Sequence, residues 1–280
     1  MTFTISILFV VQIYMKKELI DINGRNLCIK TTGNGEPLFF LHSSLLTSEM
    51  WNNQMEYFSK KYLAIAYDFC GHGKSELPKG PYSDYDDIKA IIEKKNLTKI
   101  TLIGCSYGGS VALDFTLKYP ENVSKLILIS PAVNGCNYPL RLTLESIKNF
   151  RNVRKYGIEK AAELFMRNKY WSYFVTEKNK ELFKRLFIEN KNFYNGNYRK
   201  KYILKPAAIK RLSEINTDVL LIIGDNDSGF NKNVSKILKE KVKKIKYCEI
   251  NECGHLPNIE KNEEVNRIIE KYVDFIDIAN

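Results

Sequence analysis

The stretch of sequence that decides the fold is Lys99–Leu113, KITLIGCSYGGSVAL. It begins with an apolar run typical of a buried strand and continues through glycine-rich residues into a helical pattern. Its centre, GCSYG at 104–108, fits G-x-S-x-G, in which the serine occupies a strained turn between a strand and a helix. Gly104 and Gly108 lack the Cβ atoms that would collide where the two elements meet. The pattern predicts that the Ser106 hydroxyl is presented at the edge of a sheet.

Further segments on both sides of this stretch have the composition of strands. Two of them flank Asn23-Gly24, a dipeptide that favours a tight hairpin because both residues tolerate positive φ. The others are residues 37–41, 63–67, 125–129, 219–223 and 245–250. Most are nearly continuous apolar runs separated by helical segments, which is typical of parallel strands covered on both faces. The predicted fold class is therefore α/β, with a mostly parallel, doubly wound sheet.

The alternation of strands and helices stops between residues 135 and 212, where only helical periodicity is present. We predict a helical cap over 135–212, inserted into a core formed by residues 16–134 and 213–280. Residues 1–15 are expected to be an extension outside the core. Their apolar run is shorter than a membrane span requires, and no basic segment precedes it as in a signal peptide. Membrane association or export through this extension is the alternative.

Two segments that precede Ser106 resemble motifs of the α/β-hydrolase superfamily. Residues 68–75, DFCGHGKS, are similar to the family's D-x-R-G-x-G-x-S turn, with Cys70 in place of arginine. Residues 41–44, LHSS, resemble its H-G-x oxyanion loop, with Ser43 in place of glycine. The resemblance implies the family's fold, with a helical cap above the core.

Two segments that follow Ser106 extend the resemblance. GDND at 224–227 and GHLP at 254–257 match the family's acid and histidine segments, in the family's chain order of serine, acid and histidine. The resemblance implies a catalytic triad of Ser106, Asp227 and His255. A serine hydroxyl needs such partners, because at neutral pH it is a weak nucleophile without a base and a group that orients the base. Asp225 is the alternative acid, but the family's G-x-x-D spacing selects Asp227.

Further site residues follow from the same resemblance and from composition. Backbone N–H groups of Ser44 and Tyr107 are expected to stabilise the oxyanion that acyl transfer creates. The predicted substrate pocket contains one histidine and four aromatic residues of the insertion: His42, Tyr170, Trp171, Tyr173 and Phe174. Ordinary packing within the cap is the alternative explanation for the aromatic residues.

The positive charge of the chain is concentrated in the insertion. The net charge is +11, yet residues 141–211 contain 19 Lys/Arg and 6 Asp/Glu, which leaves the rest of the chain at −2. One interpretation of this excess is a solvated lysine-rich face, and the functional alternative is that the charge attracts an anionic substrate. No nucleic-acid-binding motif accompanies the charge, so we expect no nucleic-acid partner.

These features together predict a serine hydrolase that cleaves an ester-like bond of a small molecule through an acyl-enzyme intermediate. No cofactor is expected, and no metal, because the three histidines lack the spacing of ligands. Six scattered cysteines in a chain of 280 residues favour a reducing cytoplasm. Hydrolysis of a carbon–carbon bond or a thioester by the same triad is one alternative, and a small-molecule receptor with little turnover is the other.

Overall fold

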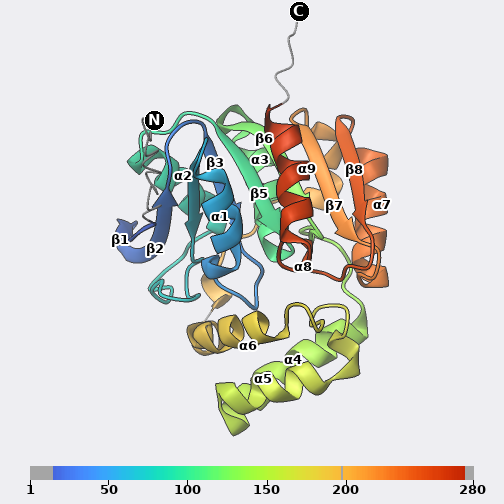
Figure 1. Cartoon of the computed structure of the whole chain (residues 1–280). Coiled ribbons are helices and arrows are strands. Elements are labelled where there is room, and N and C mark those ends of the chain that lie inside the picture. The colour runs from blue at the N-terminus through green and yellow to red at the C-terminus, as the bar shows by residue number, and fades with distance from the viewer. Residues whose placement is uncertain (1–14, 197, 275–280) are drawn as a thin grey trace, which may run out of the picture.

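The computed structural model describes residues 15–196 and 198–274, and this part of the chain forms one eight-stranded sheet (Figure 1). The strand order is β1-β2-β4-β3-β5-β6-β7-β8. β1 pairs antiparallel with β2 and β2 with β4, whereas the other neighbours are parallel. The predicted fold class is confirmed. The strands are β1 Lys16–Ile22, β2 Arg25–Thr32, β3 Pro37–Leu41, β4 Leu63–Tyr67, β5 Ile100–Cys105, β6 Val123–Ile129, β7 Asp218–Gly224 and β8 Ile245–Ile250.

Local sequence signals account for two features of this sheet. Asn23 and Gly24, at φ 53° and 76°, form the tight turn between β1 and β2 that the dipeptide predicts. The central strand β5, which forms from the apolar run at the start of residues 99–113, finishes at Cys105. As a result, the strand runs directly into Ser106.

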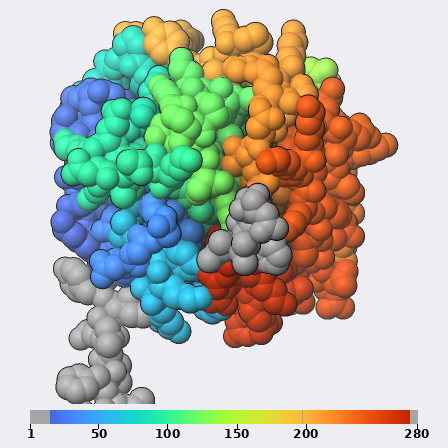
Figure 2. Space-filling view, turned by 90° about the horizontal axis from the view of Figure 1, so that it is seen from above, coloured from blue at the N-terminus to red at the C-terminus, as the bar shows by residue number. Residues whose placement is uncertain are grey.

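Helices cover both faces of the sheet because the central strands bury side chains on both sides. In β3, Phe39 and Leu41 face one layer while Leu38 and Phe40 face the other, as the two-residue period of a strand requires. The first layer contains α2 (Asp84–Lys94), α3 (Tyr107–Lys118) and α7 (Gly229–Lys241), and the second contains α1 (Asn52–Phe58) and α9 (Asn262–Asp274). Figure 2, seen from above, shows the blue N-terminal and orange-red C-terminal parts on opposite sides, in agreement with the strand order.

The helices have the following bounds. The α-helices are α1 Asn52–Phe58, α2 Asp84–Lys94, α3 Tyr107–Lys118, α4 Leu140–Tyr156, α5 Ile158–Arg167, α6 Lys180–Glu189, α7 Gly229–Lys241, α8 Pro257–Glu260 and α9 Asn262–Asp274. Short 3-10 helices are η1 Ser48–Trp51, η2 Pro120–Asn122, η3 Lys169–Trp171, η4 Lys191–Asn195, η5 Tyr198–Lys200, η6 Ala208–Lys210 and η7 Leu212–Glu214.

The insertion after β6 contains the helices that its periodicity predicts. α4, α5 and α6 form a separate layer beyond the ends of the strands, in yellow and green at the bottom of Figure 1. The last part of the insertion returns to the core, where Lys201 forms a β-bridge with Tyr82. Ala208 and Leu212 are buried in the same apolar cluster as α3. The helical layer therefore ends at η4, before the predicted boundary at residue 212.

The predicted N-terminal extension lies outside the described residues except for Met15, so its role stays a prediction. Within residues 15–196 and 198–274, no helix has both the length and the apolar character needed to cross a bilayer.

Candidate active site

Ser106 occupies a strained turn between β5 and α3. Cys105 is the last strand residue and Tyr107 the first helical one, so the serine alone makes the connection, with φ 53° and ψ −113°. Positive φ is unfavourable for a residue with a Cβ, so neighbouring contacts must hold it. Ser106 donates its N–H to Ile129 O at 2.9 Å and accepts at its carbonyl from Ala132 N at 2.9 Å. These hydrogen bonds, one to the last residue of β6 and one to the loop that follows it, fix the turn.

Glycine is required around this turn because backbones approach each other closely. A Cβ on Gly104 would overlap the carbonyl of Gly108, and a Cβ on Gly108 would overlap the carbonyl of Leu41. At Gly109 a Cβ would lie 2.7 Å from Pro131 Cβ, closer than carbon atoms can approach. The three glycines therefore let α3 begin directly against β3 and the loop after β6.

His255 and Asp227 form a buried pair beside the turn. Ser106 follows β5, Asp227 follows β7 and His255 follows β8, and because these strands are parallel all three residues leave the same edge of the sheet. His255 Nδ1 lies 2.9 Å from Asp227 Oδ1 and 3.0 Å from Oδ2. When Nδ1 donates its proton to this carboxylate, Nε2 is left as a proton acceptor, which is the form a general base needs.

The Asp227 carboxylate is held in its charged form. Burial raises its pKa, but the adjacent His255 and the hydrogen bonds to the carboxylate outweigh burial and hold the pKa below its usual value. Ser228 N donates to Oδ1 at 2.6 Å, and Asn231 Nδ2 donates to the same oxygen at 2.8 Å. The Asn231 Nδ2 atom also lies 2.6 Å from His255 Nδ1, but since both nitrogens carry hydrogen in this tautomer, its hydrogen bond goes to Asp227 Oδ1.

The loop after β3 and the start of α3 lie beside Ser106 at the cavity. Tyr107 is the first residue of α3, so its N–H has no partner within the helix and lies at the positive end of the helix dipole. Ser44 belongs to the loop after β3, and both residues line the same cavity as Ser106. The fully buried Asn190, at the end of α6, donates from Nδ2 to Ser44 O at 3.1 Å and accepts from Gly73 N at 3.1 Å. The cap thus holds the loop that carries Ser44.

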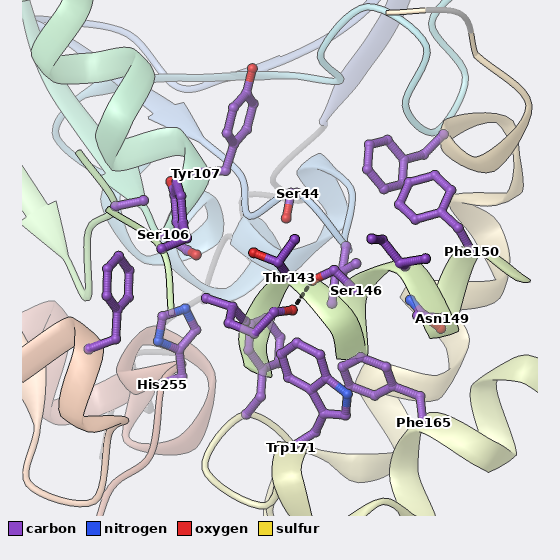
Figure 3. Close-up of a pocket in the computed structure, with 18 of the residues that line it drawn as sticks. Ser44, Ser106, Tyr107, Thr143, Ser146, Asn149, Phe150, Phe165, Trp171 and His255 are labelled. Atoms are coloured by element: carbon purple, nitrogen blue, oxygen red, sulfur yellow. Dashed lines mark hydrogen bonds between the residues drawn. The ribbon is translucent and has the colours of Figure 1, made fainter. Parts of the chain in front are cut away.

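A cavity of about 690 Å³ lies between the sheet edge and the cap. Figure 3 shows Ser106 and His255 on one side of it, with Phe150 on the opposite side. Its wall is mostly apolar and aromatic, and the cap supplies Trp171, Tyr173 and Phe174, three of the five residues that the sequence assigns to the pocket.

His42 and Tyr170 do not line this cavity, so these two predictions are corrected. His42 is completely buried, with Phe69 N donating to its Nε2 at 3.0 Å and Nδ1 lying 2.8 Å from Ser43 O. Burial lowers the pKa of this imidazole, which as a neutral group contacts the backbone of the loop that carries Ser44. Tyr170 turns away toward Arg141, whose guanidinium carbon lies 4.8 Å from the ring centre.

Glu260 is a further residue that the sequence motifs do not reveal. Its carboxylate accepts from Gly254 N at 3.1 Å and from Leu256 N at 3.3 Å, on either side of His255. It also accepts from the Thr176 hydroxyl at 3.0 Å, which joins the histidine loop to the cap. Like Asn190 and Asn231, Glu260 acts through contacts between distant segments, and no spacing along the chain announces such contacts.

A strained serine after a central parallel strand, facing a buried histidine and aspartate, defines the hydrolase class of α/β folds. The family model described as alpha/beta hydrolase fold matches residues 36–262. The chain therefore belongs to the α/β-hydrolase fold family, and the resemblance stated from the sequence motifs is confirmed.

Known proteins resemble this chain along most of its length. It is 26% identical over 261 residues to the AB hydrolase superfamily protein YisY of Bacillus subtilis, covering 88% of this chain and 94% of that protein. It is 27% identical over 270 residues to 2-hydroxy-6-oxononadienedioate/2-hydroxy-6-oxononatrienedioate hydrolase 1 of Pseudomonas putida, covering 90% and 92%. A thermophilic esterase from Thermogutta terrifontis has a similar structure, with a TM-score of 0.76 at 21% identity over 93% and 98% of the chains. The last comparison shows the fold alone.

Proposed function

We propose that this protein is a serine hydrolase that cleaves ester-like bonds of small molecules through an acyl-enzyme intermediate. The observation that carries the proposal is that Ser106, His255, Ser44 and Tyr107 line one cavity, while Asp227 contacts His255 Nδ1. A nucleophile, an oriented base and oxyanion donors are the groups that acyl transfer requires.

In this mechanism His255 Nε2 takes the proton of Ser106 Oγ as the oxygen attacks the substrate carbonyl carbon. The carbonyl oxygen becomes an oxyanion, which the N–H groups of Ser44 and Tyr107 stabilise. The intermediate expels the alcohol, and His255 returns the proton to it. Water, deprotonated by the same imidazole, then attacks the acyl-enzyme and releases the acid. Asp227 keeps the imidazole in the required tautomer throughout, and no cofactor takes part in any step.

We extend the proposal to anionic substrates and to a reducing compartment such as the cytoplasm. The positive charge of the insertion favours anions near the cavity. The name of the Pseudomonas putida relative describes a substrate with two carboxylates. All six cysteines are free, and four of them, Cys28, Cys70, Cys105 and Cys253, are buried thiols whose pKa burial raises above its usual value.

Carbon–carbon bond hydrolysis is the second candidate reaction. The Pseudomonas putida relative is named for an oxo-dioate rather than an ester, and the same nucleophile, base and oxyanion donors serve a ketone substrate.

Covalent labelling with a fluorophosphonate tests the proposed function. The probe phosphonylates a serine only when a base activates it, so the wild-type protein should be labelled at Ser106 and Ser106→Ala should not. Ser106→Ala should also lose at least about 10³-fold in kcat on p-nitrophenyl esters while keeping its melting temperature. Full ester turnover by a folded Ser106→Ala variant would refute the proposal. Saturable binding without turnover of esters, thioesters or oxo-acids would indicate a receptor instead.

A further inference from the structure

One face of α4 forms a long wall of the cavity. The lining residues of this helix begin at Leu142 and end at Arg154, and they recur at intervals of three and four. With a rise of 1.5 Å per residue, these twelve steps correspond to a wall of about 18 Å. The cavity can therefore accommodate an extended chain laid along the helix.

The chemistry of this wall changes along the helix. Its first part presents apolar side chains, Leu142, Ile147 and Phe150, together with polar ones, Thr143, Ser146 and Asn149. Arg151 and Arg154 follow, one helical turn apart, which places their side chains side by side. A substrate along this wall would thus meet apolar and uncharged polar groups first and two guanidinium groups afterwards.

Ring contacts orient the wall relative to the proposed catalytic residues. The ring of Tyr138, just before α4, lies against that of Phe230, with the ring centres 5.1 Å apart and the planes tilted by 35°. Phe230 precedes Asn231, which contacts His255. At the other end, Phe150 lies against Phe193 with the ring centres 5.3 Å apart. Figure 3 likewise places Phe150 across the pocket from His255. The arginines lie beyond Phe150, so they are remote from the His255 end.

The two guanidinium groups have no acidic partner. Both are exposed, and within the described ranges no ion pair or hydrogen bond joins Arg151 or Arg154 to a carboxylate, whereas Arg25 pairs with Asp87 and Arg211 with Glu214. No Asp or Glu of the described chain lines the cavity. Paired guanidinium groups recognise carboxylates through parallel N–H···O bonds, so this end of the cavity is complementary to an anion.

We infer that Arg151 and Arg154 form a carboxylate subsite, and that the preferred substrates are esters whose acyl chain ends in a carboxylate. This inference rests on the proposed serine hydrolase function. The ester carbonyl lies at Ser106, the methylene chain packs on the apolar part of α4, and the terminal carboxylate meets the two arginines. We expect the subsite to favour longer diacids, because the arginines follow Phe150 at the end of the wall that is remote from His255.

Pairs of p-nitrophenyl esters of equal chain length, one anionic and one neutral, separate the effect of the subsite on kcat/KM from the rate of hydrolysis itself. The neutral octanoate is compared with the suberate monoester of equal length, and the hexanoate with the adipate monoester, each by kcat/KM. In the wild type, the anionic-to-neutral ratio should be higher for the eight-carbon pair than for the six-carbon pair. Arg151→Gln/Arg154→Gln should lower the eight-carbon ratio about tenfold and leave octanoate hydrolysis within twofold. Each single variant should give part of the loss.

Lys155→Gln is the control, because it removes one positive charge from the same helical turn at a residue that does not line the cavity. Its ratio should equal that of the wild type. If Lys155→Gln lowered the anionic-to-neutral ratio of kcat/KM as much as Arg154→Gln does, the preference for anions would come only from the overall positive charge of the cap. That result would refute the subsite. Equal loss on both esters in the double variant would also refute it. Absence of octanoate hydrolysis by the wild type would instead contradict the proposed function.

Discussion

Cys253 donates its backbone N–H to Asp225 Oδ1 across 3.0 Å, so the loop after β7 holds the loop that carries His255. This hydrogen bond and others from the backbone lower the pKa of the Asp225 carboxyl, which keeps it charged as an acceptor. Asp227, two residues later, points to the imidazole itself. The two aspartates thus have different roles: Asp225 positions a backbone segment, and Asp227 orients a side chain.

This difference predicts unequal effects of amide substitutions at the two positions. Asp227→Asn should lower kcat by about 10⁴-fold, because the imidazole loses the group that fixes its tautomer and stabilises its charged form. Asp225→Asn should lower kcat less than tenfold, since the amide oxygen still accepts from Cys253 N. The measurement is kcat for a neutral ester, with melting temperatures to verify folding. A larger loss for Asp225→Asn at equal stability would show that the assignment is reversed.

The sequence predicts those parts of the site that depend on local geometry. The turn at Ser106, the hairpin at Asn23-Gly24 and the strand ends before Asp227 and His255 are fixed by neighbouring residues, so the motifs locate them. The location of His42 could not be inferred in this way. Whether its ring enters the cavity or stays beneath the loop depends on Phe69, 27 residues away, which occupies its Nε2.

The residues of the cap illustrate the same limit. Tyr170, Trp171 and Tyr173 are close in sequence, yet only the last two line the cavity, because the short helix η3 directs neighbouring side chains to different sides. The contacts of Asn190 with Ser44 and Gly73 span 146 and 117 residues. Such contacts arise from tertiary packing, and periodicity carries no information about them.

Gly108→Ala should destabilise the protein because its Cβ would overlap the Leu41 carbonyl at the end of β3. Overpacking of this kind costs about 1–3 kcal/mol of unfolding free energy. The displaced strand end also carries the loop of Ser44, the proposed oxyanion donor, so kcat should fall as well. Urea unfolding and ester hydrolysis measure the two effects. Gly80→Ala is the matched control, because nothing lies within 4 Å of a Cβ there. Equal stability of the two variants would contradict the close approach.

Asn190→Ala should disturb the loop of Ser44, the proposed oxyanion donor, through the lost bond to Ser44 O. Because the oxyanion forms only in the transition state, kcat should fall about tenfold while KM changes little. Asn192→Ala is the control, since Asn192 Nδ2 reaches Gly73 O at 3.2 Å in the same region without touching Ser44. A purely structural role of Asn190 would lower the melting temperature and leave kcat of the folded fraction unchanged.

Asp114 provides a prediction about pH and stability. This carboxylate lies on α3 and is 6% exposed, and Asn134 Nδ2 approaches its two oxygens at 3.2 and 3.4 Å. Burial raises the pKa of Asp114 to about 7, because the hydrogen bond to Asn134 only partly compensates the loss of water. In the unfolded chain the same carboxyl has a pKa of about 3.9.

Between about pH 4 and 7 the folded protein therefore holds a proton on Asp114 that the unfolded chain has released. The contribution of this residue to the unfolding free energy must fall as the pH rises through this window and then stay constant. Asp114→Asn removes the titration and keeps an acceptor for Asn134, so the variant should gain stability over the wild type as the pH rises, by up to about 4 kcal/mol. Burial lowers the pKa values of His42 and His72, so these two histidines make the unfolding free energy rise with pH. Because the wild type and the variant both contain them, this effect cancels in the difference between the two proteins. Urea unfolding of both proteins at pH 5, 6, 7 and 8 gives this difference directly, and a difference independent of pH would exclude a titrating Asp114.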